Sequence, residues 1–238
     1  MSLKTREVSY RDLETVCVGF LACDEARADR RGTVMIAHAW EGRNHFVEDK
    51  AVELAKLGYN AFAIDMYGGA RKGATPDERR ALMGPMLDNR QLLTRRVTAA
   101  FDAVRDLPET RHSRIVIMGY CFGGICALDL ARSGADLAGA VTFHGGLRPP
   151  GLLSAPIRAR VLIFHADNDK FVPQEDFLAV RDELNAAGVS WQAHIYGGVL
   201  HSFTNPAETD PATGMAYDAA AARHSWAGLL AFLEGTLS

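Results

Sequence analysis

The chain has 238 residues and a formal net charge of −3, with 48% apolar and 23% charged residues. This composition is typical of a globular protein and excludes collagen-like and low-complexity chains. A small negative charge without a basic block argues against nucleic acid or a membrane surface as a partner. No apolar run approaches the roughly 18–20 residues of a membrane span, and residues 1–7 lack the apolar segment of a secretory signal.

The four cysteines, Cys17, Cys23, Cys121 and Cys126, are too few for a disulfide scaffold. No Cys-x-x-Cys pair predicts a zinc ribbon or a thioredoxin-like motif. We therefore expect four reduced thiols in a cytoplasmic protein.

The first half of the chain predicts strands and helices in alternation. Residues 5–10 and 14–21 suggest a short hairpin. The apolar run 33–38 fits a strand buried on both faces, as in a parallel sheet. We further expect a helix over 46–57 with Asn44 as its N-cap, a strand over 60–65, and helices over 77–96 and 97–107.

The second half continues this alternation and completes the fold prediction. We expect strands over 114–119, 138–143, 160–165 and 190–196, and helices over 122–132, 173–187 and 217–237. Such an order predicts an α/β fold, with a mostly parallel sheet of about eight strands and helices on both faces. Without a repeat or linker, residues 1–238 are expected to form a single domain. Ligands bind such sheets at the carboxyl ends of strands, so the turns there should carry the site.

One of these turns carries a nucleophile pattern. Gly119-Tyr120-Cys121-Phe122-Gly123-Gly124 joins a buried strand to a helix, as in the nucleophile elbow of α/β-hydrolases but with cysteine in place of serine. The strand and helix approach closely in such an elbow, so the residues two before and two after the nucleophile must be small. The helix N-terminus favours a thiolate. We predict Cys121 as the nucleophile, against the alternative of a buried apolar thiol, and Cys126 as a packing residue.

A thiol nucleophile also needs a base and a group that orients the base. Among the downstream histidines, His201 follows the last strand through Gly197-Gly198, at the carboxyl edge of the sheet. The others are His144, His165, which ends an earlier strand, His194, in mid-strand, and His224, on the closing helix. We predict His201 as the base. The acid should follow strand 160–165, where position alone leaves both Asp167 and Asp169 open.

These motifs together resemble the dienelactone hydrolase (carboxymethylenebutenolidase) family of the α/β-hydrolase superfamily. Residues 119–124 match its G-Y-C-x-G-G elbow, and His201-Ser202-Phe203 matches its H-S-F motif. Residues 169–173 resemble its D-x-x-V-P loop, which selects Asp169 over Asp167. The resemblance implies an α/β-hydrolase fold and a Cys121–His201–Asp169 triad without metal or organic cofactor. It also implies hydrolysis of a lactone or activated ester through a thioester intermediate.

The resemblance extends to the oxyanion hole. Its implied donors are the backbone N–H groups of Phe122 and, by alignment of residues 38–42, Trp40. The family's activating glutamate corresponds to Ala39 here, and Glu41 is a candidate replacement unless it is a solvated loop residue or part of a local ion pair.

The expected substrate contacts are less well defined. The family's carboxylate-binding arginine corresponds to Asn205. Arg71, Arg79 and Arg80 are candidate replacements, unless they are only solvated. Tyr67, Tyr120 and Phe203 are further candidates for contact with a small, rather apolar ester or lactone.

Two other classes of protein and the oligomeric state remain open. The alternatives are a non-catalytic binding protein of this fold and a thiol redox sensor that uses Cys121 and Cys126. A serine-type hydrolase is set aside because the elbow carries no serine. We expect a monomer or a homodimer.

Overall fold

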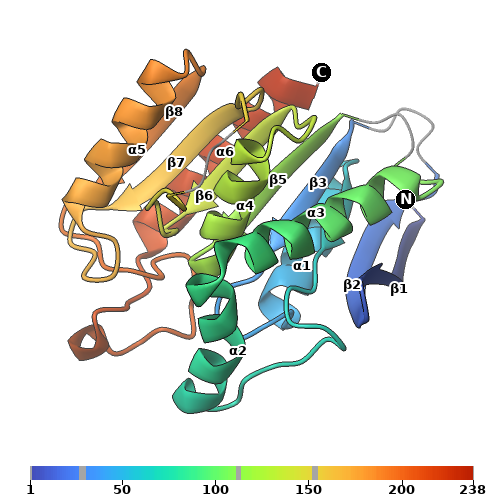
Figure 1. The fold of residues 1–238 in the computed structure, drawn as a ribbon, viewed down its shortest axis with the longest axis horizontal. Helices are drawn as coiled ribbons and strands as arrows, with labels where there is room; N and C mark the ends of the chain where they lie inside the picture. The colour runs from blue at the N-terminus through green and yellow to red at the C-terminus, as the bar shows by residue number, and fades with distance from the viewer. Residues whose placement is uncertain (1, 27–30, 111–113, 152–154, 238) are drawn as a thin grey trace. The chain divides into compact units, whose positions relative to one another are not determined.

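The computed structural model describes residues 2–26, 31–110, 114–151 and 155–237 (Figure 1). Its strands form an eight-stranded sheet in the order β1-β2-β4-β3-β5-β6-β7-β8. Contacts divide the chain into two compact units, one reaching to Ile117 and including Leu237, the other running from Met118 to Thr236. The division falls within β5 (Ile115–Tyr120). The mostly parallel sheet with its helices confirms the predicted α/β fold.

The first unit opens with the predicted hairpin, which is longer than expected. β1 (Leu3–Asp12) pairs antiparallel with β2 (Thr15–Asp24), and β2 pairs antiparallel with β4 (Asn60–Ala63). β4 in turn pairs parallel with β3 (Thr33–Ala37). Every residue of β3 and β4 is buried, which explains why the residues that follow Thr33 and Asn60 in these strands are all apolar.

The helices of the first unit begin at residues that cap them. Asn44 accepts a hydrogen bond from the Val47 N–H at the start of α1 (His45–Lys56), as predicted, and Thr75 forms a capping box at the start of α2 (Pro76–Asp88). The predicted boundary between the next two helices, at residues 96–97, is wrong. The chain turns at Asn89 (φ −128°, ψ 86°), whose side chain accepts from the Leu92 N–H and so starts α3 (Arg90–Asp106).

A buried carboxylate shapes the loop that follows β4. The Asp65 side chain accepts hydrogen bonds at 2.8–3.0 Å from the backbone N–H groups of Val18, Tyr67, Gly68 and Ala70. The predicted strand 60–65 therefore ends at Ala63, and the Asp65 side chain organises the turn beyond it.

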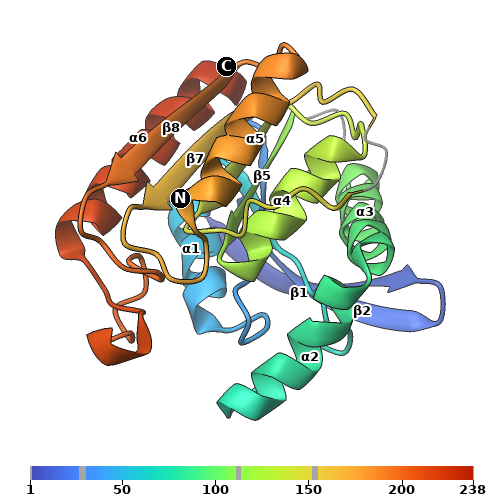
Figure 2. The same ribbon diagram turned by 60° about the vertical axis from the view of Figure 1, so that its left-hand side comes forward.

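The second unit continues the sheet with parallel strands. β6 (Gly139–Phe143), β7 (Arg160–Ala166) and β8 (Trp191–Tyr196) pair in sequence order. The helices are α4 (Phe122–Arg132), α5 (Gln174–Ala186) and α6 (Ala219–Leu237), and the loop before α6 contains a short 3-10 helix, η1 (Pro211–Thr213). α4 and α5 lie on one face of these strands and α6 on the other (Figure 2).

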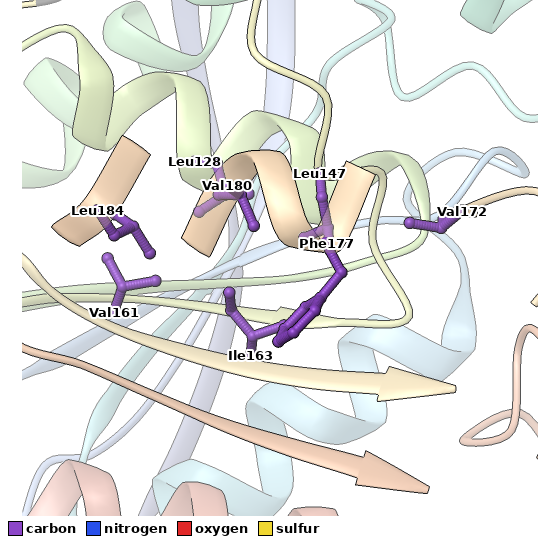
Figure 3. Packing of buried hydrophobic residues seen from close by; sticks show 8 residues of the cluster. All are labelled: Leu128, Leu147, Val161, Ile163, Val172, Phe177, Val180 and Leu184. Atoms are coloured by element: carbon purple, nitrogen blue, oxygen red, sulfur yellow. The ribbon is translucent and has the colours of Figure 1, made fainter. Parts of the chain in front are cut away.

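Successive residues of β7 point to opposite faces of the sheet, and each face packs against its own helices. Val161 and Ile163 pack with Phe177, Val180 and Leu184 of α5 and with Leu128 of α4, in a cluster that Leu147 and Val172 complete (Figure 3). Phe164 points to the opposite face, where α6 approaches so closely that a Cβ on Gly228 would lie 3.0 Å from its ring. None of the described helices has both the length and the apolar character that crossing a membrane requires.

Candidate active site

Cys121 occupies a strained turn between β5 and α4. Its backbone lies at φ 51° and ψ −112°, a region that residues other than glycine rarely adopt. A Cβ on Gly119 would lie 2.0 Å from the Gly123 carbonyl oxygen, and one on Gly124 would lie 2.2 Å from the Thr142 Oγ1. Gly119, two residues before the nucleophile, is therefore required for β5 and α4 to approach, as the elbow pattern predicts, and Gly124 leaves room for Thr142 of β6. The Cys121 N–H donates to the Phe143 carbonyl at 3.1 Å, which ties the turn to β6.

His201 and Asp169 form a buried pair in the same unit. The His201 Nδ1 lies 2.6 Å from the Asp169 Oδ2, with the two side chains 4% and 0% exposed. The other carboxylate oxygen of Asp169 accepts from the N–H groups of Phe171 and Val172 at 2.8 and 3.1 Å. These bonds fix the carboxylate independently of the histidine. Asp167, which sequence position could not separate from Asp169, is exposed.

Cys121 is the next group in this chain of hydrogen bonds. Burial lowers the pKa of His201, but the charge of Cys121, its hydrogen bond, and the hydrogen bond and charge of Asp169 together raise that pKa to about 10. An imidazole with such a pKa is protonated at neutral pH. The structure thus brings together Cys121, His201 and Asp169, with the imidazole hydrogen-bonded to the other two side chains.

The turn that carries His201 is held by backbone and aromatic contacts. The His201 carbonyl accepts from the Ala216 N–H at 3.0 Å, and the Phe203 carbonyl accepts from the Asp218 N–H at 3.0 Å. The ring of Phe171, which is 56% exposed, packs edge-on against His201 with centroids 5.1 Å apart. The loop before α6 therefore runs beside the turn that carries His201.

Sequence reasoning gave His144 no role, yet it belongs to this site. It directly follows β6, is 2% exposed, and places its ring edge-on to that of His201 with centroids 5.0 Å apart. The signal available in the sequence was its position at the carboxyl end of a strand, before Gly145-Gly146.

The remaining histidines of the second unit have other neighbours. His165 stacks on Phe177 with centroids 5.4 Å apart. His194 and His224 pack on each other, with centroids 5.6 Å apart.

Two of the predicted substrate contacts in the second unit are buried aromatic rings. Phe203 has no exposed surface and packs edge-on against His144 and Tyr196, with centroids 5.1 and 5.2 Å away. Tyr120 is 2% exposed and stacks on Phe143 at 4.8 Å. The side chain of Asn205 accepts from the Ala207 N–H at 3.1 Å, within its own loop.

The candidates from the first unit form a cluster after β3 and β4. The Trp40 indole N–H donates to the Glu41 carboxylate at 3.0 Å, and the Arg79 guanidinium lies 5.3 Å from the Trp40 ring centroid and 3.6 Å from that carboxylate. The Tyr67 hydroxyl donates to the Trp40 carbonyl at 3.0 Å, so donation to a substrate would require breaking this bond. Arg71 donates to the carbonyls of Tyr67 and Gly68. Among all described residues, no group of three or more His, Cys, Asp or Glu side chains is placed to hold a metal ion.

Comparison with known proteins decides the family. The model of the dienelactone hydrolase family matches residues 19–237, which contain Cys121, Asp169 and His201. The chain belongs to the dienelactone hydrolase family. It is accordingly a hydrolase of the carboxylic ester and lactone class, and membership does not favour a binding protein or a redox sensor.

Individual members of the dienelactone hydrolase family and their relatives align along most of the chain. A crystal structure of a dienelactone hydrolase-like promiscuous phosphotriesterase from metagenomic libraries is 35% identical, covers 99% of each chain and superposes with a TM-score of 0.94. A Bradyrhizobium protein named a probable 2-oxo-3-(5-oxofuran-2-ylidene)propanoate lactonase is 28% identical over 86% of this chain and 84% of its own. The protein usf of Aquifex pyrophilus is 28% identical over 86% of this chain and 88% of its own.

Proposed function

We propose that the protein hydrolyses lactones or activated carboxylic esters through a Cys121–His201–Asp169 triad and a thioester intermediate. The observation that carries this proposal is the buried bond of 2.6 Å between His201 and Asp169, with Cys121 at the elbow as the second partner of the imidazolium. An activated nucleophile with an oriented base is the arrangement that covalent catalysis requires.

The first half of the proposed reaction acylates the enzyme. The Cys121 thiolate attacks the carbonyl carbon, a C–S bond forms, and the C=O electron pair moves to oxygen. The N–H groups of Phe122 and Trp40 are the proposed donors to this oxyanion. When the C=O bond reforms, the C–O bond to the leaving group breaks, and the leaving oxygen takes the Nε2 proton of His201.

The second half of the proposed reaction regenerates the enzyme. His201, now neutral, takes a proton from water, and the resulting hydroxide attacks the thioester carbonyl. Collapse of the second tetrahedral intermediate breaks the C–S bond and releases a carboxylic acid and the thiolate. Asp169 keeps the imidazole oriented in both halves.

The nucleophile limits the substrates that suit this chemistry. A thiolate is a better leaving group than an alkoxide, so the first tetrahedral intermediate of a simple alkyl ester returns to substrate. Lactones that release a stabilised enolate, and aryl esters, avoid this reversal. We therefore propose small molecules of these two kinds as substrates.

Hydrolysis of p-nitrophenyl acetate by matched cysteine variants tests the proposal. Cys121→Ala should reduce kcat/KM by at least about 10³-fold, because the nucleophile is lost. Cys126→Ala, which removes a buried thiol from inside α4, should stay within about twofold. Equal rates for wild type and Cys121→Ala would refute the triad. Mass spectrometry of the wild type after rapid acid quench should show one added acetyl group, absent from Cys121→Ala.

A second candidate function follows from the phosphotriesterase with a TM-score of 0.94. A thiolate attacks phosphorus as it attacks a carbonyl, and p-nitrophenoxide leaves readily. Diethyl p-nitrophenyl phosphate should therefore release p-nitrophenoxide with wild type and not with Cys121→Ala. Release at the buffer rate by active wild-type enzyme would exclude this second function.

We also propose a cytoplasmic location. None of the four cysteines is in a disulfide bond, and a nucleophilic thiol loses its function when it is oxidised. A reducing compartment would keep Cys121 active.

A further inference from the structure

The two hydrogen bonds of the His201 ring, to Asp169 and to Cys121, leave one motion of the ring unrestrained. They hold the two ring nitrogens, but the ring can still tilt about the line that joins these atoms. Such a tilt must stay small if the Nε2 proton is to remain directed at Cys121 for proton transfer. Side contacts with the ring must therefore set its tilt, and the rings of His144 and Phe171 provide such contacts at 5.0 and 5.1 Å. Phe171 is 56% exposed, whereas His144 is buried, so His144 is the more rigid support.

His144 also contacts the turn beyond His201. Its Nε2 lies 2.8 Å from the Thr204 Oγ1, and its ring meets Phe203 edge-on at 5.1 Å. Its own backbone N–H donates to the Phe164 carbonyl of β7 at 2.8 Å. The residue thus joins the sheet to three positions of the segment 201–204.

The backbone of His144 is strained, which argues for a functional reason to keep a side chain there. Its φ is 40°, in the left-handed region that favours glycine. Among the described residues of the second unit other than glycine, positive φ occurs only at Cys121, His144 and Ser202. Each strained residue costs about 1–3 kcal/mol, and such residues cluster at functional sites.

The hydrogen bonding of His144 indicates which form of the ring is present. The Nδ1 is buried and has no hydrogen-bond partner. A buried N–H without an acceptor is more costly than a bare acceptor nitrogen, so the contacts favour the tautomer with its proton on Nε2, where it can be donated to Thr204. Burial and the neighbouring His201 imidazolium lower the pKa of His144 well below 6.5, so the ring is neutral. The titratable side chains whose rings meet it are His201 and Tyr120.

We propose that His144 is a positioning residue for His201, whose ring sets the tilt of the imidazole and whose Nε2 bond holds the Thr204 turn. This proposal rests on the proposed role of His201 as the base. The proposal gives His144 two contributions, the ring contact with His201 and the hydrogen bond to Thr204. Different substitutions can remove these contributions one at a time.

Three variants test these contributions. His144→Gln keeps an amide N–H for Thr204 but removes the ring, and His144→Phe keeps a ring but removes the donor. Thr204→Val removes the acceptor with little change of shape. Each should reduce kcat for p-nitrophenyl acetate, the His144 variants by about 10–100-fold and Thr204→Val by about 3–10-fold, with KM within about threefold. A small misplacement of a catalytic group has effects of this size. His194→Gln, on β8, is the matched histidine control and should stay within twofold.

A second readout separates positioning from folding. A tilted imidazolium stabilises the thiolate less, so the pH profile of Cys121 alkylation by iodoacetamide should move to higher pH in both His144 variants, but not in His194→Gln. If both His144 variants unfold, judged by circular dichroism, Thr204→Val carries the test, and an unchanged kcat would overturn the proposal.

The two proposals fail in different ways. A Cys121→Ala enzyme with wild-type rates refutes the proposed function. If that variant is inactive while folded His144 variants keep wild-type kcat and the wild-type alkylation profile, the function stands and the positioning role is refuted.

Discussion

Replacement of Asp169 by asparagine removes one charge from the buried pair while it preserves the shape of the side chain. One carboxylate oxygen accepts two backbone N–H groups at 2.8 and 3.1 Å, so the asparagine oxygen must remain there. Its NH2 group then faces the His201 Nδ1, at the position of the oxygen that lies 2.6 Å away in the native protein. A donor at this place holds the neutral imidazole with its proton on Nε2, where it cannot accept a proton.

The size of the expected loss in kcat/KM follows from the interactions that Asp169→Asn removes. Burial lowers the pKa of His201, and Cys121 and Asp169 together raise it to about 10; in Asp169→Asn the contribution of Asp169 disappears and the pKa falls. The imidazolium is then a smaller fraction of the enzyme at pH 7. Because the tautomer is also wrong, we expect kcat/KM for p-nitrophenyl acetate to fall by about 10²–10⁴-fold, as an analogous substitution does in a serine triad.

Asp167→Asn is the matched control, because its carboxylate lies two residues earlier and is exposed. It should change kcat/KM by less than about twofold. An Asp169→Asn enzyme within fivefold of wild type, or an equal loss in Asp167→Asn, would show that the buried bond does not orient a catalytic imidazole.

Three further outcomes are expected. Because the His201 pKa is about 10, kcat/KM should fall near pH 10, where His201 loses the proton that it gives to the leaving group. A fall of kcat/KM that is already complete a little above pH 7 would contradict this. Gly119→Ala should lower the free energy of unfolding, measured by urea titration, by about 3 kcal/mol or more, because the added Cβ would lie 2.0 Å from backbone atoms. Gly197→Ala is the control: a Cβ there would have no atom within 4 Å, so the free energy of unfolding should change by less than about 0.5 kcal/mol. Asp12→Ala should cost about 3–5 kcal/mol at pH 7, because it leaves the buried Arg96 guanidinium without the carboxylate 2.6 Å away. Burial raises the pKa of Asp12, but its hydrogen bonds to Arg95 and Arg96 lower it below 3.8 overall. The difference in free energy of unfolding between wild type and Asp12→Ala should therefore become smaller as the pH falls and the carboxylate is protonated.

The sequence was most informative where the local backbone determines the chemistry. The elbow could be read from Gly119, Cys121 and Gly123 because close packing of strand and helix excludes larger residues there. The Asn44 cap was predictable because it acts within one helical turn. The α2–α3 boundary was missed although Asn89 is a recognised capping residue, since helical periodicity continues across it.

Contacts between segments that lie far apart in the sequence could not be predicted from sequence patterns. His144 meets residues 57 to 60 positions later, from His201 to Thr204, and no periodicity encodes such a meeting. For the same reason, position could not choose between Asp167 and Asp169. The choice came from a family motif, and the structure places Asp169 beside His201 through bonds to the backbone of its own loop.

The strained backbone at Cys121, His144 and Ser202 has a consequence for the rest of the unit. Three positions at about 1–3 kcal/mol each represent a substantial part of the 5–15 kcal/mol by which a typical domain is stable. The apolar cluster of Figure 3 must offset this strain, although none of its side chains takes part in the proposed chemistry. Truncating a side chain of that cluster, for example Phe177, would therefore reduce the free energy of unfolding of a unit that already carries the cost of three strained positions.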